Sequence, residues 1–170
     1  MFLPLSTERF LLRCLTSNDA TERYLLWLQS PSADFIINKA SEVIQLATYI
    51  ESHTQNEHTM LLGIFEKRTL LHIGNIKFEF LNAQQSIVEM GILIGDINWQ
   101  GIGVAGEVIS AMGDYFRDHF NTHKMVLGVD KDNIAAIKAY QKIGFSEELE
   151  PLSVVDATHG MLMAWNLRNH

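Results

Sequence analysis

The 170-residue sequence has one cysteine, Cys14, only three prolines and no long apolar run. A single cysteine excludes an internal disulfide and fits a reducing compartment. No stretch approaches the roughly 18 apolar residues of a membrane span, and the opening MFLPLSTERF lacks the basic start and apolar stretch of a signal peptide. These absences predict a soluble cytoplasmic protein with no membrane partner.

Positive charge is also scarce: 13 Lys+Arg stand against 20 Asp+Glu, a formal net charge of −7. The electric field of this net negative charge repels polyanions, so we expect no nucleic-acid partner. With 47% hydrophobic and 19% charged residues, the composition is that of a globular protein. No linker-like tract and no internal repeat divides the chain, which predicts one domain over 1–170.

Hydrophobic periodicity changes twice along the chain. We expect strands over 9–13, 59–66, 70–81, 86–95, 124–130, 145–150 and 161–167. We expect one helix that starts at 17–19 and stops before Pro31, and a second over 41–53. A third follows the apolar stripe of Val104, Val108, Met112, either Tyr115 or Phe116, and Phe120. A fourth runs from the N-cap Asn133 to Gly144. Gly74 marks a bulge or a close backbone approach inside its strand. This element order fits an α+β fold.

The glycine-rich segment 100–105 connects an expected strand to the long expected helix. Gly101 and Gly103 let the backbone turn tightly and approach a ligand, and the free N–H groups of a helix N-terminus attract an anion such as a diphosphate. The segment lacks the Lys-Ser/Thr of a P-loop and the third glycine of a dinucleotide fingerprint. By glycine spacing alone, a tightly packed helix start is an equally good interpretation.

Two motifs add a resemblance to a known family. Gln100–Ala105 (QGIGVA) resembles the Gln/Arg-x-x-Gly-x-Gly/Ala acetyl-CoA signature of the GCN5-related N-acetyltransferase (GNAT) family. Asn133–Phe145 (NIAAIKAYQKIGF) resembles that family's second cofactor segment. The resemblance implies a GNAT-like fold, a mixed and mostly antiparallel central sheet of about seven strands with helices on both faces. Arg13, Asp19 and Trp99 look most like the subgroup that acetylates ribosomal-protein N-termini.

The resemblance also implies direct transfer of an acetyl group from acetyl-CoA to a primary amine, without an acyl-enzyme. Backbone N–H groups of the glycine segment would hold the diphosphate, and the strand before it would pair with the pantetheine arm. The implied acetyl-CoA-binding residues are Ile92, Leu93, Ile94, Gln100, Gly101, Ile102, Gly103, Val104, Ala105, Asn133 and Tyr140.

Two residues are the implied catalysts. Tyr140 would protonate the departing CoA thiolate; with an ordinary phenol pKa of about 10 against about 8.5 for the thiol, positioning must assist the transfer. Its alternative role is an aromatic packed on the inner helix face. Glu89 is the candidate base for the acceptor ammonium, and its alternative is a solvated hairpin-end carboxylate. Asn133 would bond the cofactor arm, cap its helix, or do both.

Other reactive side chains point to no further site. The pairs His119/His123 and His53/His58 lack a third ligand, so no metal is expected. Cys14 is not activated by a pattern of basic neighbours at a helix start, which predicts a small buried apolar residue and disfavours an acyl-cysteine mechanism.

The acceptor and the assembly stay open. A ribosomal-protein-type N-terminal acetyltransferase, a small-amine or amino-sugar acetyltransferase and a non-catalytic acyl-CoA-binding domain are the alternatives, and the acidic surplus favours a cationic acceptor. The last expected strand, Met161–Leu167, offers an edge through which a homodimer could form.

Overall fold

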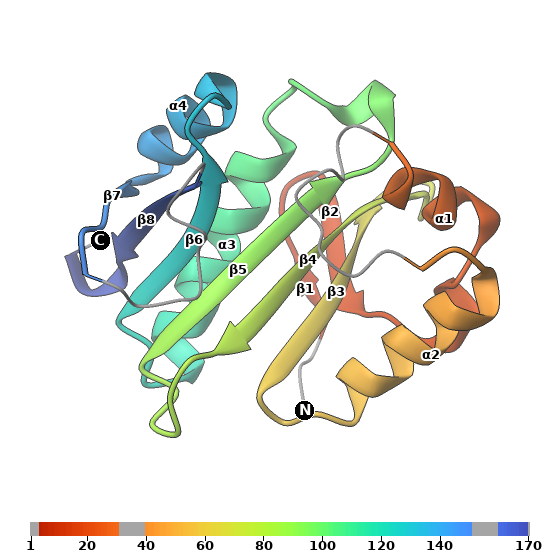
Figure 1. The fold of residues 1–170 in the computed structure, drawn as a ribbon, viewed down its shortest axis with the longest axis horizontal. Helices are drawn as coiled ribbons and strands as arrows, with labels where there is room; N and C mark the ends of the chain where they lie inside the picture. The colour runs from red at the N-terminus through yellow and green to blue at the C-terminus, as the bar shows by residue number, and fades with distance from the viewer. Residues whose placement is uncertain (1–3, 31–39, 151–159, 170) are drawn as a thin grey trace. The chain divides into compact units, whose positions relative to one another are not determined.

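The structure, a computed structural model, describes residues 4–30, 40–150 and 160–169 (Figure 1). The strands are β1 (Leu5–Ser6), β2 (Phe10–Cys14), β3 (Thr59–Glu66), β4 (His72–Phe80), β5 (Ile87–Ile94), β6 (Lys124–Asp130), β7 (Ser146–Glu147) and β8 (Gly160–Asn166). The helices are α1 (Glu22–Leu28), α2 (Val43–Thr54), α3 (Val104–His119) and α4 (Ile134–Ile143), with short 3₁₀ helices η1 (Ser17–Asp19), η3 (Ile97–Trp99) and η4 (Leu167–Asn169). None of these helices is both long enough and apolar enough to span a membrane.

The strands form one eight-stranded sheet in the order β1-β2-β3-β4-β5-β6-β8-β7. β5 and β6 are parallel, whereas β1-β2, β2-β3, β6-β8 and β7-β8 are antiparallel. This arrangement confirms the predicted α+β fold with a mixed, mostly antiparallel sheet. β1 is an additional short strand, and β7 covers only two of the residues expected in a strand over 145–150.

The sequence analysis expects the strand Met161–Leu167 to offer an edge of the sheet, and this placement is wrong. β8 is the penultimate strand, fully paired with β6 on one side. On its other side β7 pairs with Met163 and Ala164. The sequence could not show this, because strand order depends on where a two-residue strand docks.

The described chain divides into two compact units, which we describe separately. Unit 1 consists of residues 1–77 and 92–104, and unit 2 of residues 78–91 and 105–170. The prediction of a single domain over 1–170 stays a prediction.

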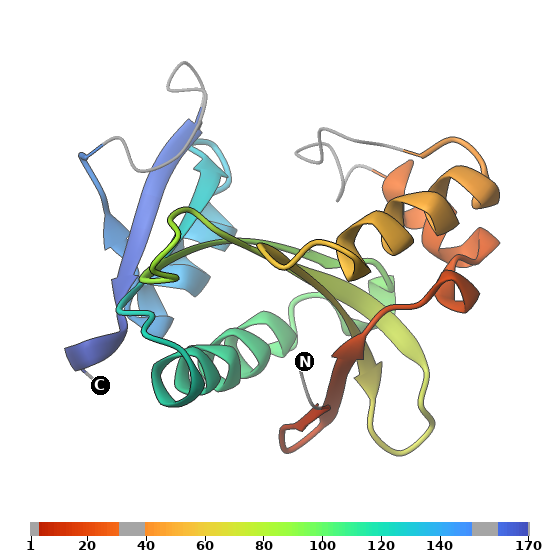
Figure 2. The ribbon, with the colours of Figure 1, turned by 90° about the horizontal axis from the view of Figure 1, so that it is seen from below.

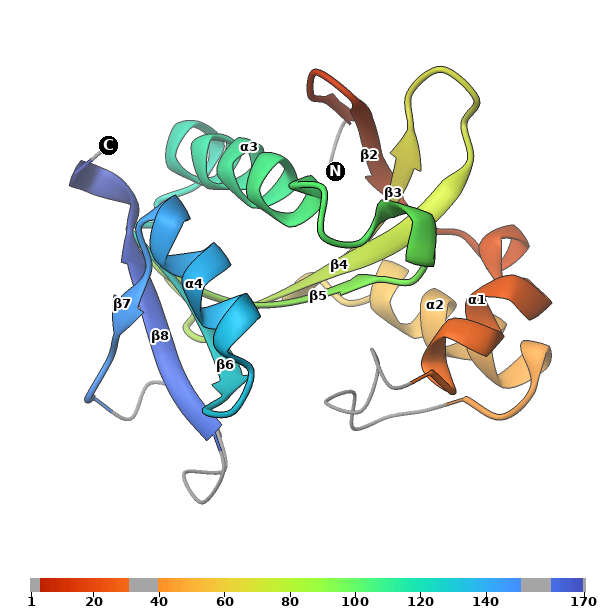
Figure 3. The same cartoon turned by 90° about the horizontal axis from the view of Figure 1, so that it is seen from above.

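In unit 1, α1 and α2 pack together against strands that include β3 (Figures 2 and 3). Thr21 caps α1, because its hydroxyl accepts a hydrogen bond from the N–H of Tyr24 at 3.2 Å. The buried apolar cluster of this unit consists of Leu15, Tyr24, Trp27, Leu28, Leu46, Ile50, Leu61, Phe65 and Leu93. A Cβ on Gly95 would lie 2.0 Å from the Trp27 ring, so only glycine lets α1 dock on the end of β5.

Cys14 is exposed, which corrects the prediction that it is buried. It is the last residue of β2, and the next residue, Leu15, enters the core in its place with 1% exposure. Strand alternation ends there, so the pattern that buries Phe10 and Leu12 does not extend to the cysteine.

In unit 2, α3 buries one face, as its apolar stripe predicts. Val108, Met112 and Phe116 are fully buried, and the Phe116 ring contacts Phe78 and Phe80 edge-on at 4.8 and 5.8 Å. Of the two aromatic residues that fitted the stripe, Phe116 is therefore the core residue.

Candidate functional site

The glycine loop is the part of unit 1 that joins β5 to α3. Gly101 and Gly103 have φ values of +72° and +83°, in the left-handed region that favours glycine. A Cβ on Gly101 would meet nothing within 4 Å, so conformation rather than crowding requires glycine there. α3 begins directly after Gly103, at Val104. Its first N–H groups have no partner within the helix and lie at the positive end of the helix dipole, which suits a phosphate group.

The turn before the loop, residues 96–99, is held by an ion pair with α1. Asp96 is buried, and one of its carboxylate oxygens accepts hydrogen bonds from the backbone N–H and the side-chain amide of Asn98 at 2.9 and 3.1 Å. The other oxygen pairs with Arg23, whose guanidinium lies over the Trp27 ring, 5.3 Å from its centroid. Sequence reasoning missed this ion pair, because its partners are far apart in the chain.

The end of β5 is bound to β4. The N–H groups of Gly95 and Asp96 both donate to the carbonyl oxygen of Ile73 at 3.0 Å, the hydrogen-bond pattern of a β-bulge. A Cβ on Gly74 would lie 2.4 Å from the carbonyl oxygen of Leu93. The predicted close backbone approach at Gly74 is thereby confirmed, and the bulge lies on the facing segment, at Gly95 and Asp96.

Among the residues expected to meet the cofactor in unit 1, two have side chains committed to the protein. The Leu93 side chain belongs to the buried apolar cluster, so only its backbone is available to a ligand. The Gln100 side-chain amide donates to the carbonyl oxygen of Ile94 at 2.8 Å and links the loop to β5. Ile102 is half-exposed, and its cofactor contact, like those of the other loop residues, stays a prediction.

Glu89 lies in unit 2, where the parallel pairing of β5 with β6 ends. The register runs from Ile87 opposite Lys124 to Glu89 opposite Val126, and no later residue of β5 pairs with β6 in the described part of the chain. Beyond Glu89, the edge of β5 is left without the β6 ladder. The glutamate thus marks the start of the segment for which the resemblance implies pairing with the pantetheine arm.

Asn133 and Tyr140 lie on the second predicted segment, also in unit 2. The side-chain oxygen of Asn133 accepts a hydrogen bond from the N–H of Ala136 at 3.1 Å, and Gly144 ends α4 with a φ of +122°. These contacts confirm the predicted cap and helix end. The Tyr140 ring is partly buried and lies 5.8 Å from the Phe145 ring, in agreement with a packing role.

Burial raises the pKa of the Tyr140 hydroxyl. The group therefore keeps its proton at neutral pH, as a proton donor must. A higher pKa also makes proton transfer to a thiolate less favourable, which increases the part that positioning has to play.

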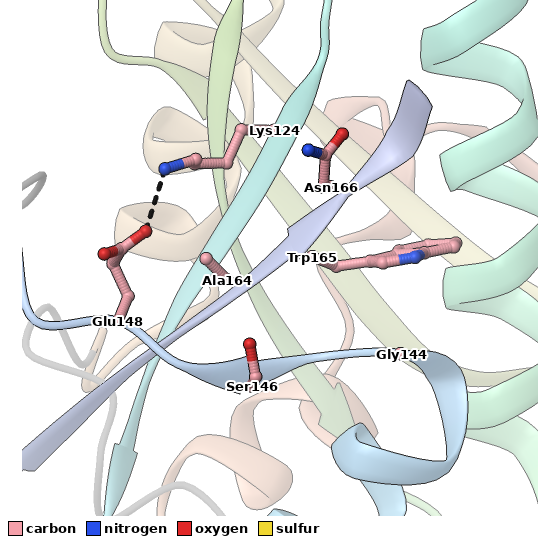
Figure 4. A pocket seen from close by; sticks show the side chains of 7 residues that line it. All are labelled: Lys124, Gly144, Ser146, Glu148, Ala164, Trp165 and Asn166. Atoms are coloured by element: carbon pink, nitrogen blue, oxygen red, sulfur yellow. Dashed lines mark hydrogen bonds and ion pairs between the residues drawn. The ribbon is translucent and has the colours of Figure 1, made fainter. Parts of the chain in front are cut away.

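Other clusters stand outside the candidate site. A surface hollow of unit 2, shown in Figure 4, is lined by Lys124, Gly144, Ser146, Glu148, Ala164, Trp165 and Asn166. Its Lys124 amine donates to Glu148 at 2.8 Å, and none of the predicted site residues lines it. Within the described ranges, no group of three or more His, Cys, Asp and Glu side chains could hold a metal ion.

Comparison with known proteins agrees with this fold. The family model described as "Acetyltransferase (GNAT) domain" matches residues 9–146, a span that contains the glycine loop. The chain belongs to the GNAT family.

Individual relatives are more distant. Spermidine N(1)-acetyltransferase of Escherichia coli K12 is 28% identical over 138 residues, which cover 80% of this chain and 66% of that protein. The chain thus spans just under two thirds of the length of that relative. A structure provisionally described as a ribosomal-protein-serine acetyltransferase of Vibrio cholerae superposes with a TM-score of 0.78 at 18% identity, covering 96% and 97% of the two chains. AAC(6')-Ib in complex with paromomycin and acetyl-CoA gives a TM-score of 0.75 at 15% identity, with 94% of each chain covered.

Proposed function

We propose that this protein transfers an acetyl group from acetyl-CoA directly to a primary amine. The observation that carries the proposal is the glycine loop, in which Gly101 and Gly103, both with positive φ values, directly precede the N-terminus of α3. Backbone dipoles there can hold a diphosphate without a basic surface, as a chain of net charge −7 requires.

The chemistry assigns one proton transfer to each of two side chains. Glu89 takes a proton from the acceptor ammonium, because only the neutral amine can attack the thioester carbonyl. The C–N bond forms and the C–S bond breaks, Tyr140 gives its proton to the departing CoA sulfur, and the nitrogen loses its second proton to water as the neutral amide forms. Glu89 then releases its proton to water and the Tyr140 phenolate takes one from water, so the reaction releases one proton overall.

A small cationic amine is the acceptor we favour. The excess of acidic over basic residues attracts cations, and the relative from Escherichia coli is named for spermidine. The features that suggested ribosomal-protein N-termini have a structural explanation. Arg13 and Asp19 form a two-pronged ion pair at 2.7 and 2.8 Å, and Asp19 also accepts a hydrogen bond from the N–H of Thr16.

The test is a panel of acceptors, monitored by release of the CoA thiol from acetyl-CoA and by calorimetric binding of CoA. The panel contains spermidine, an amino sugar and a peptide with a free N-terminus. We expect CoA binding together with thiol release for spermidine. Binding without release across the panel would favour the non-catalytic acyl-CoA-binding domain, and absence of binding would refute the proposal.

A further inference from the structure

The glycine loop lies in a long part of the sequence without basic side chains. Residues 78–116 contain no Lys and no Arg, although they include the whole loop and most of α3. A positive side chain that acts on this loop must therefore come from a different part of the chain.

Arg9, the residue before β2, supplies such a positive side chain. Its Nη1 donates a hydrogen bond to the carbonyl oxygen of Ile102 at 3.1 Å. A Cβ on Gly103 would lie 3.6 Å from its Nη2, so the guanidinium is in contact with the loop backbone. All three residues belong to unit 1.

The position of Arg9 is itself held on two sides. Its carbonyl oxygen accepts a hydrogen bond from the N–H of Lys67 at 2.9 Å, which fixes the backbone. Its guanidinium lies over the ring of Phe10, 4.9 Å from the centroid, and that buried ring contacts Trp99 at 5.6 Å, just before the loop. Two consecutive side chains at the start of β2 therefore contact this region, Arg9 the loop itself and Phe10 the residue just before it.

The hydrogen bond has a directional consequence for the loop. The Ile102 carbonyl and the Gly103 N–H belong to one planar trans peptide unit, in which the two groups point in opposite directions. By holding the carbonyl, the guanidinium turns the Gly103 N–H away from Arg9. A charged donor on the carbonyl also polarises the peptide, which strengthens its N–H as a donor.

We propose that Arg9 is a positioning residue for diphosphate binding, which orients and polarises the Ile102–Gly103 peptide so that the Gly103 N–H faces the cofactor. The inference rests on the proposed function, because it takes the diphosphate of acetyl-CoA as the ligand. It adds a side chain that lies outside both family motifs, Gln100–Ala105 and Asn133–Phe145.

The test measures CoA binding by titration calorimetry for the full chain and the variants Arg9→Gln, Arg9→Lys and Lys67→Gln. Lys67→Gln is the matched control, because it removes the same charge from a donor to a different carbonyl, that of Thr7. We expect about a fivefold to tenfold higher Kd for Arg9→Gln. Arg9→Lys, which retains a charged donor, should stay within about threefold of the parent, and the control should not change.

A donor without a diphosphate separates positioning from general damage to the fold. With S-acetylpantetheine, Arg9→Gln should retain the parental kcat/KM, whereas with acetyl-CoA its KM should rise at constant kcat. Equal Kd values for Arg9→Gln and the parent, equal weakening by Lys67→Gln, or an equal loss with S-acetylpantetheine would each overturn the inference. If the parent binds no CoA, the proposed function fails first.

Discussion

The two segments that carry the family motifs are stabilised in different ways. In unit 1, the glycine loop is held by partners far away in the sequence, through the Arg9 contact with Ile102 and the pairing of Arg23 with Asp96. In unit 2, α4 is shaped mainly by its own residues, since Asn133 caps it and Gly144 ends it. A motif can therefore describe the second segment almost completely and the first only in part.

This difference suggests a division of labour. The loop offers backbone N–H groups and so should govern cofactor binding, whereas the second segment offers the Tyr140 hydroxyl and so should govern turnover. Substitutions in the two segments should accordingly change different kinetic constants.

The largest effect should come from Tyr140→Phe. Removing a general acid lowers kcat by about 100-fold or more, while the Kd for acetyl-CoA should stay within about twofold, because the ring and its packing on Phe145 remain. Stopped-flow thiol release and calorimetry measure the two quantities. An unchanged kcat would remove Tyr140 from the mechanism and leave it a packing residue.

Gly103→Ala should have the opposite signature. Its φ of +83° strains any Cβ-bearing residue by about 1–2 kcal/mol, so the loop should leave its binding conformation and the Kd for CoA should rise about tenfold. Gly106→Ala is the matched control, because its Cβ would meet nothing within 4 Å and its φ is not positive. Equal affinities for the two variants would contradict the proposed role of the loop conformation.

A second glycine in α3 tests whether unit 2 depends only on local contacts. A Cβ on Gly113 would lie 2.3 Å from the Trp165 ring, a contact between α3 and β8. Gly113→Ala should destabilise the protein by about 1–3 kcal/mol, whereas Gly106→Ala should stabilise it by about 0.5–1 kcal/mol. Denaturant unfolding compares the two, and equal midpoints would show that the helix can shift to accept the methyl group.

The smallest effect concerns His72 of unit 1, which lies among aromatic rings. It stacks on Phe65 at 4.8 Å and contacts Trp27 at 5.0 Å, and burial lowers its pKa, although a hydrogen bond to Asn75 at 2.8 Å works against that change. A lowered pKa means that the unfolded chain binds the proton more readily. The stability contribution is therefore present above the ordinary value of about 6.5 and is lost as pH falls toward the lowered value.

Unfolding midpoints measured between pH 8 and pH 5 test this prediction. His72→Phe, which keeps a ring in the cluster, should flatten the profile. A parental profile that is retained in His72→Phe would assign the pH dependence to other groups.

Much of the fold could be predicted because hydrophobic period and capping are local properties. β3 and β6 have the bounds that the sequence indicates, and the stripe of α3 faces the core. The misplacement of β8 and the exposure of Cys14 arise from strand order and strand ends. Both depend on contacts between residues that are distant in the chain.

For the candidate site, residue order alone is enough to locate the glycine loop, to place the cap and end of α4, and to support the resemblance that names Tyr140 and Glu89. How the loop is held follows only from the folded chain, in which Arg9 contacts its backbone, Arg23 pairs with the preceding turn and the end of β5 is bound to β4. The two kinds of contact differ in the sequence distance over which they act. Glycine conformation and helix capping act over three or four residues, whereas a guanidinium finds its carbonyl or carboxylate only after the chain has folded.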